Sequence, residues 1–336
     1  MSIPAAVFLD TSIFDGQNYN YQSTALSTFV PACTKRGVRL LLPEPTDQEI
    51  ERHIKERSTD ALVALAEARR KAPFLAKWPG MPPPTGKSEA LDRFQVYSIA
   101  RKEWRAFLKQ FMVVTLGYED LDVKKVMRWY GNVEAPFRDG KKRKEFPDAF
   151  AVAMLEAYAQ RESVYVAVVS SDPDFKRACE RFSSLLYFES LPRLTEVLLS
   201  DDTRIDQLRD AIQKDIDDIE SEILEMAPGL SLYHDSERYD VRSVEDRQVE
   251  SLETSIVAIG DRECTITFNA RLEIEVELQW EDWASDEETE TLTGNVTDTL
   301  DVSGTAKITF DAKTHKLAKV ALLEFDEDEL EVRTVP

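Results

Sequence analysis

A short apolar run that ends on an acid lies near the start of this chain of 336 residues. Residues Ala5 to Leu9 are apolar, and Asp10, Thr11 and Ser12 follow directly. A run of this length between turn-forming residues predicts a buried strand. In an open parallel sheet, ligands bind at the carboxyl ends of the strands. The pattern therefore predicts an α/β fold with Asp10 at the ligand-binding edge.

Apolar strands and amphipathic helices alternate through the first 200 residues. Further strands are predicted at Val38 to Leu42, Val164 to Val169 and Leu185 to Phe188. Helices are predicted at Ser23 to Cys33, from Thr46, and over Asp60 to Lys71, Lys87 to Phe111, Leu121 to Tyr130 and Asp148 to Gln160. This alternation predicts a parallel sheet with helices on both faces. No Gly-rich loop follows the first strand, which excludes a P-loop and a dinucleotide fingerprint.

The apolar period changes in the remaining residues. Between Thr203 and Met226 the apolar spacing of three and four predicts one amphipathic helix. From Ile266 to Trp280 apolar and polar residues alternate, which predicts a long strand with one buried face. We therefore expect an α/β domain over residues 1–200, an amphipathic connecting helix over 201–228, and an antiparallel, β-rich, acidic domain over 229–336.

Charge is divided unevenly between the two halves. The net charge is −21, but residues 1–200 hold 29 Lys and Arg against 26 Asp and Glu, whereas residues 201–336 hold 13 against 37. The first half could hold nucleic acid, whereas the second would repel it. The three cysteines are far apart, and the sequence contains no membrane-spanning run and no signal-peptide pattern. We therefore expect a cytoplasmic protein without disulfides.

Four acids far apart in the sequence can be assigned to the same edge of the predicted sheet. Asp10 and Asp172 follow strands, and Glu49 and Asp148 lie in first helical turns. Each acid also has a local explanation: a helix cap for Asp10, a capping box from Thr46 to Glu49, the helix dipole for Asp148, and a turn for Asp172. Both readings remain open for each acid taken alone.

Together, the acids predict a metal site. Clustered carboxylates repel unless a cation lies among them, and oxygen ligands select hard ions such as Mg²⁺ or Mn²⁺. Metal ions held in this way can activate water and stabilise charge on a phosphodiester. The basic run Lys141, Lys142, Arg143 and Lys144 lies just before Asp148, so it predicts phosphate binding as readily as a solvated turn. His53, one helical turn after Glu49, is a candidate substrate contact or a packed surface histidine.

Four segments, in this order, resemble the motifs of a PIN-domain nuclease: Phe8-Leu9-Asp10-Thr11-Ser12, Thr46-Asp47-Gln48-Glu49-Ile50, Glu145-Phe146-Pro147-Asp148-Ala149 and Val169-Ser170-Ser171-Asp172-Pro173-Asp174-Phe175. The resemblance covers roughly residues 3–200 and is greatest to a bacterial PIN-like subgroup with a Lys-rich stretch before its Phe-Pro-Asp motif. It implies a PIN-like parallel sheet, Mg²⁺ or Mn²⁺ as cofactor, and endonuclease action on single strands, usually of RNA.

The resemblance also implies roles for individual residues. Asp10, Glu49, Asp148 and Asp172 would be the catalytic metal-site acids, with Asp174 as an auxiliary ligand, while Thr11 and Ser12 would bind metal-linked water or phosphate. Glu44 competes with Glu49 for the second acidic position; we prefer Glu49, because a proline on each side is expected to hold Glu44 in an extended turn. The segment from Ile54 to Glu145 is longer than in compact members of the family, so its helices are expected to shape a different substrate path.

These features support a metal-dependent endoribonuclease, acting as a toxin or a defence effector. Two alternatives are a PIN-like module that binds RNA or protein without cutting it, and a structure-specific DNase. For the acidic residues 229–336 we consider three roles. They could compete with nucleic acid for the basic run, bind a protein partner or a second copy of the chain, or form a solvated domain kept soluble by its charge.

Overall fold

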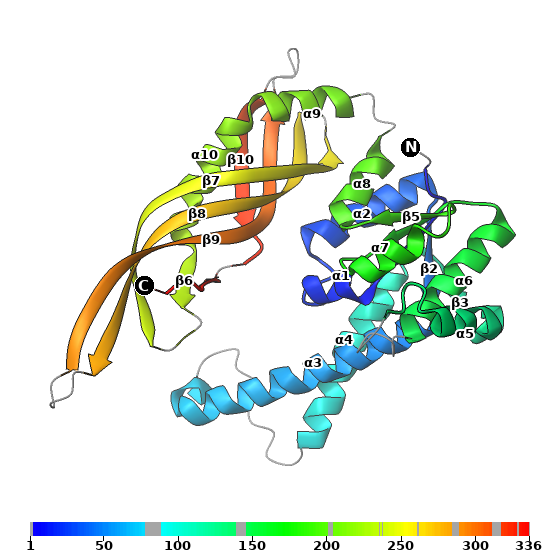
Figure 1. The fold of residues 1–336 in the computed structure, drawn as a ribbon, viewed down its shortest axis with the longest axis horizontal. Coiled ribbons are helices and arrows are strands. Elements are labelled where there is room, and N and C mark those ends of the chain that lie inside the picture. Colours follow the sequence, from blue (N-terminus) through cyan, green and yellow to red (C-terminus); the bar gives the residue numbers. More distant parts are fainter. Residues whose placement is uncertain are drawn as a thin grey trace. The chain divides into compact units, whose positions relative to one another are not determined.

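The structure is a computed structural model that describes residues 3–77, 89–138, 146–200, 204–234, 236, 238–260, 262–283, 289–310, 317–327 and 329–335. The chain divides into two compact units, Met1–Leu194 and Thr195–Pro336 (Figure 1). The two units have different folds, and each contains buried apolar clusters of its own.

A five-stranded parallel sheet forms the centre of the first unit. Its strands are β1 (Ala6–Leu9), β2 (Arg39–Pro43), β3 (Met112–Leu116), β4 (Val166–Val169) and β5 (Leu185–Phe188). They lie in the order β3-β2-β1-β4-β5, and every neighbouring pair is parallel. Strand β1 is therefore central, with β2 on one side and β4 on the other.

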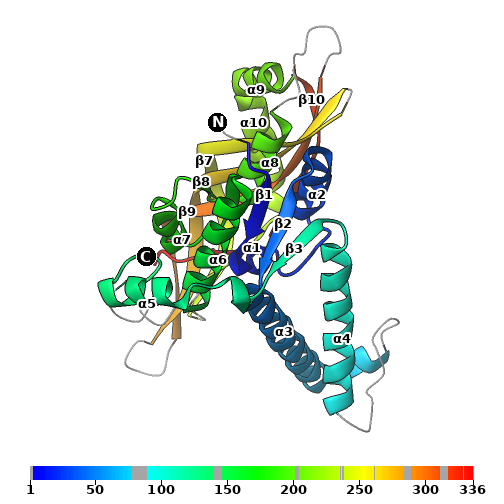
Figure 2. The ribbon, with the colours of Figure 1, turned by 90° about the vertical axis from the view of Figure 1, so that its right-hand side faces the viewer.

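Helices cover both faces of this sheet. They are α1 (Thr11–Gly16), α2 (Thr24–Arg36), α3 (Glu44–Lys71), α4 (Glu89–Leu108), α5 (Val123–Asn132), α6 (Phe146–Glu162), α7 (Pro173–Cys179) and α8 (Leu191–Leu199). Helices α5, α6 and α7 share one buried cluster with Phe8 and Val168. The alternate sheet residues Val7 and Leu9 are equally buried, and Figure 2 shows α2 on the side of the sheet opposite α6. The predicted PIN-like α/β fold is confirmed.

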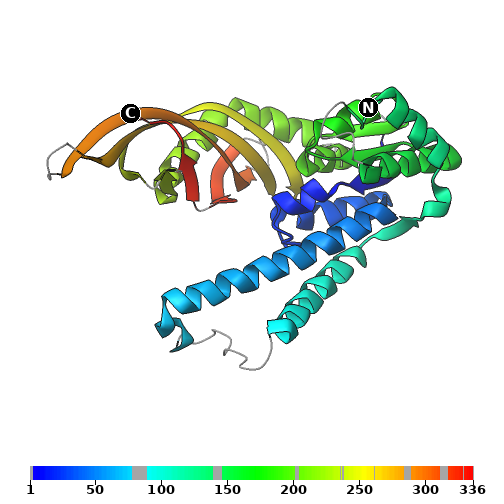
Figure 3. The ribbon, with the colours of Figure 1, turned by 60° about the horizontal axis from the view of Figure 1, so that its bottom comes forward.

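The region between β2 and β4 departs from the predicted elements. One helix, α3, runs through residues that the sequence assigned to two, and its N-cap is Pro43, so the predicted capping box at Thr46 is wrong. Strand β3 was not predicted, although four of its five residues are apolar; it lies at the sheet edge, where its burial is incomplete. Figure 3 shows α3 and α4 extending together away from the sheet of the first unit.

A long antiparallel sheet organises the second unit. Its strands are β7 (Tyr239–Ile259), β8 (Glu263–Trp283), β9 (Thr289–Phe310) and β10 (Leu317–Phe325), in the order β10-β9-β8-β7. A small parallel pair is formed by β6 (Ser231–His234) and β11 (Glu329–Val332). The predicted C-terminal antiparallel β-rich region and its long alternating strand are confirmed.

The amphipathic stretch before this sheet forms two helices, α9 (Ile205–Lys214) and α10 (Ile216–Met226), which meet at Asp215. Their buried residues, which include Ile205, Leu208 and Ile219, belong to one cluster with Ile266 and Leu272 of β8. Both helices therefore cover the apolar face of the sheet instead of only connecting two domains.

All three cysteines are free and buried, and burial raises the pKa of each thiol. Among the helices of the described residues, none combines the length and the apolar character needed to cross a membrane.

Candidate functional site

Asp10 lies where the sequence placed it, at the carboxyl end of the central strand. Leu9 of β1 is in register with Val169 of β4, and the Asp10 amide donates to the Val169 carbonyl at 3.0 Å. Asp10 is 6% exposed, although its side chain is a carboxylate. Residues 170–172, which follow β4, therefore begin beside Asp10.

Hydroxyl groups hold the Asp10 carboxylate. Ser12 Oγ donates to Asp10 Oδ2 at 2.6 Å, and Ser170 Oγ donates to the same oxygen at 2.8 Å. Thr11 Oγ1 makes a longer contact of 3.4 Å with Oδ1. Within the described residues, no lysine, arginine or histidine lies within ion-pair distance of Asp10. A buried carboxylate held only by neutral donors keeps a net negative charge, which a cation would neutralise.

Ser170 connects this carboxylate with Asp172. While its hydroxyl donates to Asp10, it accepts from the Asp172 amide at 3.0 Å. The Ser171 amide donates to Ser12 Oγ at 3.3 Å, which joins the same two loops a second time. Ser170 is fully buried, and the sequence analysis gave it no role. Extending the register of Leu9 and Val169 by one residue would have placed it beside Asp10.

Asp172 and Asp174 differ in their surroundings. Asp172 is the N-cap of α7 and accepts from the Asp174 amide at 2.7 Å. The Asp174 side chain is buried and forms ion pairs with Arg177 and, at 3.5 Å, with Arg138. Asp172 therefore lies beside Asp10. Asp174 is the buried member of an ion-pair cluster, and the two arginines would compete with a metal ion for its carboxylate.

Tyr187 of β5 reports the negative charge of this edge. Its hydroxyl donates to the Ser170 carbonyl at 2.7 Å. Burial raises the pKa of Tyr187, and negative charges raise it further, Glu189 most and Asp172 and Asp10 less. The two carboxylates therefore act on the same side chain, which places both near the carboxyl ends of β1, β4 and β5.

Glu44 and Glu49 occupy different faces of α3. Glu44 is the first helical residue after β2, not part of an extended turn, so the reason given for preferring Glu49 is wrong. Gln48 donates to Glu44 and accepts from Tyr118, which follows β3, the strand on the far side of β2 from β1. The structure therefore directs the Glu44 face away from Asp10.

Glu49 faces the opposite way, toward the helix that follows β1. Its Oε1 lies 3.9 Å from His53 Nε2, and His53 Nδ1 lies 3.0 Å from Asp15 Oδ2 on α1. Arg52 pairs with Glu49 at 3.2 Å. This geometry supports Glu49 as the second acid, for a new reason, and it gives His53 a structural partner in Asp15.

Asp148 lies in the first turn of α6 and is half-buried. Helix α6 ends at Glu162 and the chain enters β4 at Val166, so the helix returns to the amino end of that strand. Its first turn must then lie toward the carboxyl edge of the sheet, where Asp10 is. Lys141, Lys142, Arg143 and Lys144 lie outside the described residues.

Among the described residues, no group of three or more acidic, histidine or cysteine side chains converges closely enough to hold a metal ion. Ser170 links Asp10 with the backbone of Asp172 through hydrogen bonds. Carboxylates repel one another until a cation lies among them, so tighter convergence is not expected of the chain alone.

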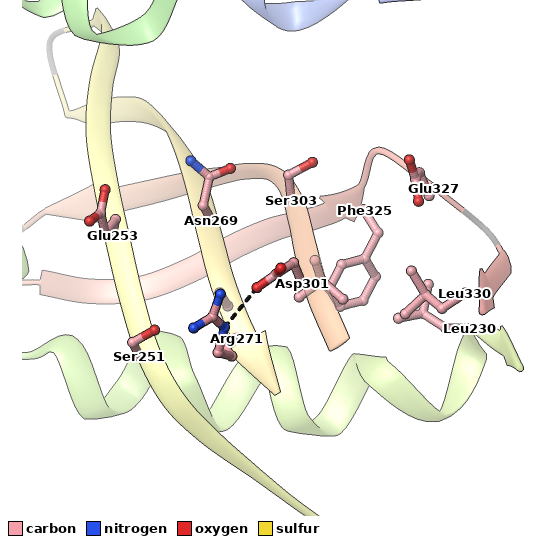
Figure 4. Close-up of a pocket in the computed structure, with 12 residues that line it drawn as sticks. Leu230, Ser251, Glu253, Asn269, Arg271, Asp301, Ser303, Phe325, Glu327 and Leu330 are labelled. Carbon is pink, nitrogen blue, oxygen red and sulfur yellow. Dashed lines mark hydrogen bonds and ion pairs between the residues drawn. The ribbon is translucent and has the colours of Figure 1, made fainter. Parts of the chain in front are cut away.

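A cavity of about 440 Å³ lies elsewhere, in the second unit. Arg271 and Asp301 form an ion pair of 2.9 Å on its wall, and Phe325 and Leu330 contribute apolar surface (Figure 4). It shares no residue with the acidic edge.

A protein-family comparison matches residues 7–175 with the model of the PIN domain. The match includes the candidate site acids Asp10, Glu49, Asp148, Asp172 and Asp174. No curated protein matches the chain, and no solved structure does.

Proposed function

Because the chain belongs to the PIN-domain family, whose members are generally nucleases, we propose that it is a metal-dependent endonuclease that cuts single strands, with RNA as the substrate. The metal dependence, the preference for RNA and a role as a toxin or defence effector are parts of this proposal. Three buried free thiols agree with a cytoplasmic location, where thiols stay reduced.

One observation carries the proposal: the buried carboxylate of Asp10, held by Ser12 and Ser170 at the carboxyl end of the central strand. Burying a carboxylate without a cationic partner costs stability, so a fold keeps one where the charge has a use. The hydroxyls fix the orientation of this group before substrate arrives, as catalysis by a positioned charge requires.

The donor set fits a hard divalent cation. Asp10 and Asp172 offer carboxylate oxygens. Asp148 lies in the first turn of α6, which begins toward the same edge of the sheet, and Glu49 lies on the face of α3 that is directed toward α1. Oxygen donors of this kind suit Mg²⁺ or Mn²⁺. When bound, such an ion supplies an acidified water and a positive charge at the phosphate.

The chain's own residues divide the remaining work. Asp10 and Asp172 are the proposed metal-holding carboxylates; the Ser170 hydroxyl orients the carboxylate of Asp10 and holds the backbone amide of Asp172. Ser12 and Thr11 lie beside Asp10 and would meet the phosphate or its water. The Lys141–Lys144 run would hold the backbone of the strand, and His53, paired with Asp15, would approach substrate only by changing partner.

The test is cleavage of labelled single-stranded RNA, single-stranded DNA and duplexes of both, by the full chain with Mg²⁺, Mn²⁺ or EDTA. Asp10→Asn should abolish cleavage and leave the melting temperature within about 3 °C of wild type, because the amide oxygen can still accept from Ser12 and Ser170. Asp60→Asn, at an exposed position of α3, is the control and should retain activity.

Cleavage by Asp10→Asn at the wild-type rate would refute the proposal. Binding of RNA without cleavage under every metal condition would favour the alternative of a non-cutting module. Cleavage confined to DNA would favour the DNase. Induced expression in cells tests the effector role, since growth should stop only when Asp10 is intact.

A further inference from the structure

Helix α4 presents a row of basic side chains that the acidic edge does not use. Arg101, Lys102, Arg105 and Lys109 line a shallow hollow of about 570 Å³, together with Ser98 and Ala106. At 100° per residue, the five of these positions that belong to α4 fall within an arc of about 140° on one face of the helix, and Lys109 is the first residue after it. The row follows the surface of the element that extends away from the sheet (Figure 3).

An exposed aromatic ring lies on the same face. Phe94 is 69% exposed, and seven residues separate it from Arg101, so the two point within about 20° of each other. From Phe94 to Lys109 the row spans about 22 Å, at 1.5 Å per residue. The buried residues Trp104 and Phe107 lie outside this arc, while buried Leu108 borders it beside Arg101.

Contacts with α3 hold part of this row in place. Arg105 donates to Glu51 at 2.5 Å and to Asp47 at 3.2 Å, and Arg101 donates to Glu51 at 3.0 Å. Trp104 Nε1 also donates to Asp47 at 3.1 Å. The two arginines are thus oriented while their side chains remain about half exposed. Lys102 and Lys109 stand beside them on the surface.

We propose that this face of α4 is a binding track for single-stranded nucleic acid, on which Arg101, Lys102, Arg105 and Lys109 contact phosphates and Phe94 stacks on a base. Proteins that hold single strands combine a positively charged groove with exposed aromatic rings, and both are found together here. The inference rests on the proposed function, since the track would lead a strand to the acidic edge. It adds to the proposed site a second surface for binding nucleic acid, distinct from the basic run at residues 141–144.

An acidic protein could also bind a basic helix face. Phosphates are favoured because the row is regular, lines a hollow and includes a flat exposed ring, which a base can use and a carboxylate cannot. Asp47 and Glu51 neutralise part of the charge of Arg101 and Arg105. The loss of the two lysines or of the Phe94 ring should therefore weaken nucleic-acid binding most.

The experiment measures binding by the full chain in EDTA, so that no cleavage is needed. Labelled 20-nucleotide RNA and DNA strands are titrated at several salt concentrations. The variant Lys102→Gln/Lys109→Gln is compared with Lys35→Gln/Lys214→Gln, which removes the same charge from exposed lysines elsewhere. Phe94→Ala is compared with Phe74→Ala, a ring that is 71% exposed.

The lysine pair on α4 should lower the slope of log affinity against log salt by about 1.4, since each phosphate contact in a single strand contributes roughly 0.7. Phe94→Ala should weaken binding about tenfold without changing the slope, because stacking releases no counterions. Neither control should change either quantity. The RNA and DNA strands show which nucleic acid the track prefers.

Variants of α4 that bind as their controls do would overturn the inference, as expected if the face binds a protein. This failure is separable from that of the proposed function. If cleavage depends on Asp10 while the α4 variants bind normally, the track is wrong and the nuclease stands. If no cleavage is found while the α4 variants lose binding, the track stands without the nuclease.

Discussion

Ser170 joins the two acids that the strands bring together. Its hydroxyl donates to Asp10 and accepts from the amide of Asp172, so one side chain orients both carboxylate-bearing loops. Ser170→Ala should lower the single-turnover cleavage rate about 10- to 100-fold while changing substrate affinity little, because binding groups are retained. The lost hydrogen bonds should cost about 1–2 kcal/mol of unfolding free energy.

The control for this prediction is Ser171→Ala. Its amide, which bonds Ser12, is kept, so the variant should cut at nearly the wild-type rate. Equal cleavage rates for the two serine variants would show that the hydrogen bond from Ser170 to Asp10 is not required for cleavage. Urea unfolding of both variants measures the expected difference in stability.

At this scale the sequence predicts positions better than partners. Asp10 and Asp172 were placed correctly because a strand end in a parallel sheet has one location. The spacing of three residues along one helix allows Arg177 to pair with Asp174, but nothing in the sequence shows that Arg138 lies close to it. Glu49 was chosen over Glu44 for a wrong reason, and only the packing of α3 against α1 supports the choice.

At the level of elements, the contact of α3 with α4 depends on Glu51. Burial alone would raise its pKa, but hydrogen bonds from Arg105 and Arg101 outweigh burial and lower the pKa below its ordinary value near 4.5. A lowered pKa means that ionised Glu51 stabilises the fold above about pH 4.5. That contribution is lost as the pH falls through the lowered pKa.

Glu51→Gln should therefore destabilise the protein by about 1 kcal/mol near pH 7, a modest figure because Glu51 is partly exposed. The difference from wild type should shrink as the pH falls through the lowered pKa of Glu51, because the wild-type carboxyl then becomes neutral as well. Glu56→Gln, on the same helix and 58% exposed, should differ little from wild type at any pH. A pH-independent difference for Glu51→Gln would contradict the assignment of the effect to its charge.

The helices and strands were predicted where their apolar period was regular. Residues 112–116 were missed because an edge strand buries little on one side. The capping box from Thr46 to Glu49 failed because Pro43 and Pro45 favour an earlier helix start, with proline in the first turn. In both cases the sequence carried a local pattern, the apolar run of residues 112–116 and the two prolines before Thr46. A neighbouring pattern was given more weight, the long helix that precedes Met112 and the Thr46–Glu49 spacing.

At the scale of the molecule, the charge division predicted a border at residue 200, whereas the two compact units meet between Leu194 and Thr195. The border differs because the amphipathic stripe from Ile205 to Ile223 covers the sheet of the second unit. The sequence shows an apolar stripe on the predicted helix and an apolar face on the alternating strand. Because each must be buried against another element, their packing against each other could have been predicted. A cut after Met226 would keep the stripe and remove its partner.

Residues 1–226 should therefore aggregate or self-associate, whereas residues 1–200 should remain monomeric and folded. Size-exclusion chromatography and circular dichroism of the two fragments check this. A monomeric 1–226 fragment would show that α9 and α10 do not depend on the sheet.

If the acidic unit competes with nucleic acid, residues 1–200 should also bind nucleic acid more tightly than the full chain at low salt. The difference in affinity should disappear above about 0.3 M salt, where charges are screened.

The central position of β1 has a consequence for how the protein is made. Asp10 leaves the ribosome before Ser170, which lies 160 residues later in the chain. At 5–20 residues per second, that interval lasts roughly 8–32 s. During this time the nascent chain carries the first acid without the strand that completes its surroundings. A nuclease built in this order stays inert beside the message and ribosome that produce it until most of its first unit has emerged.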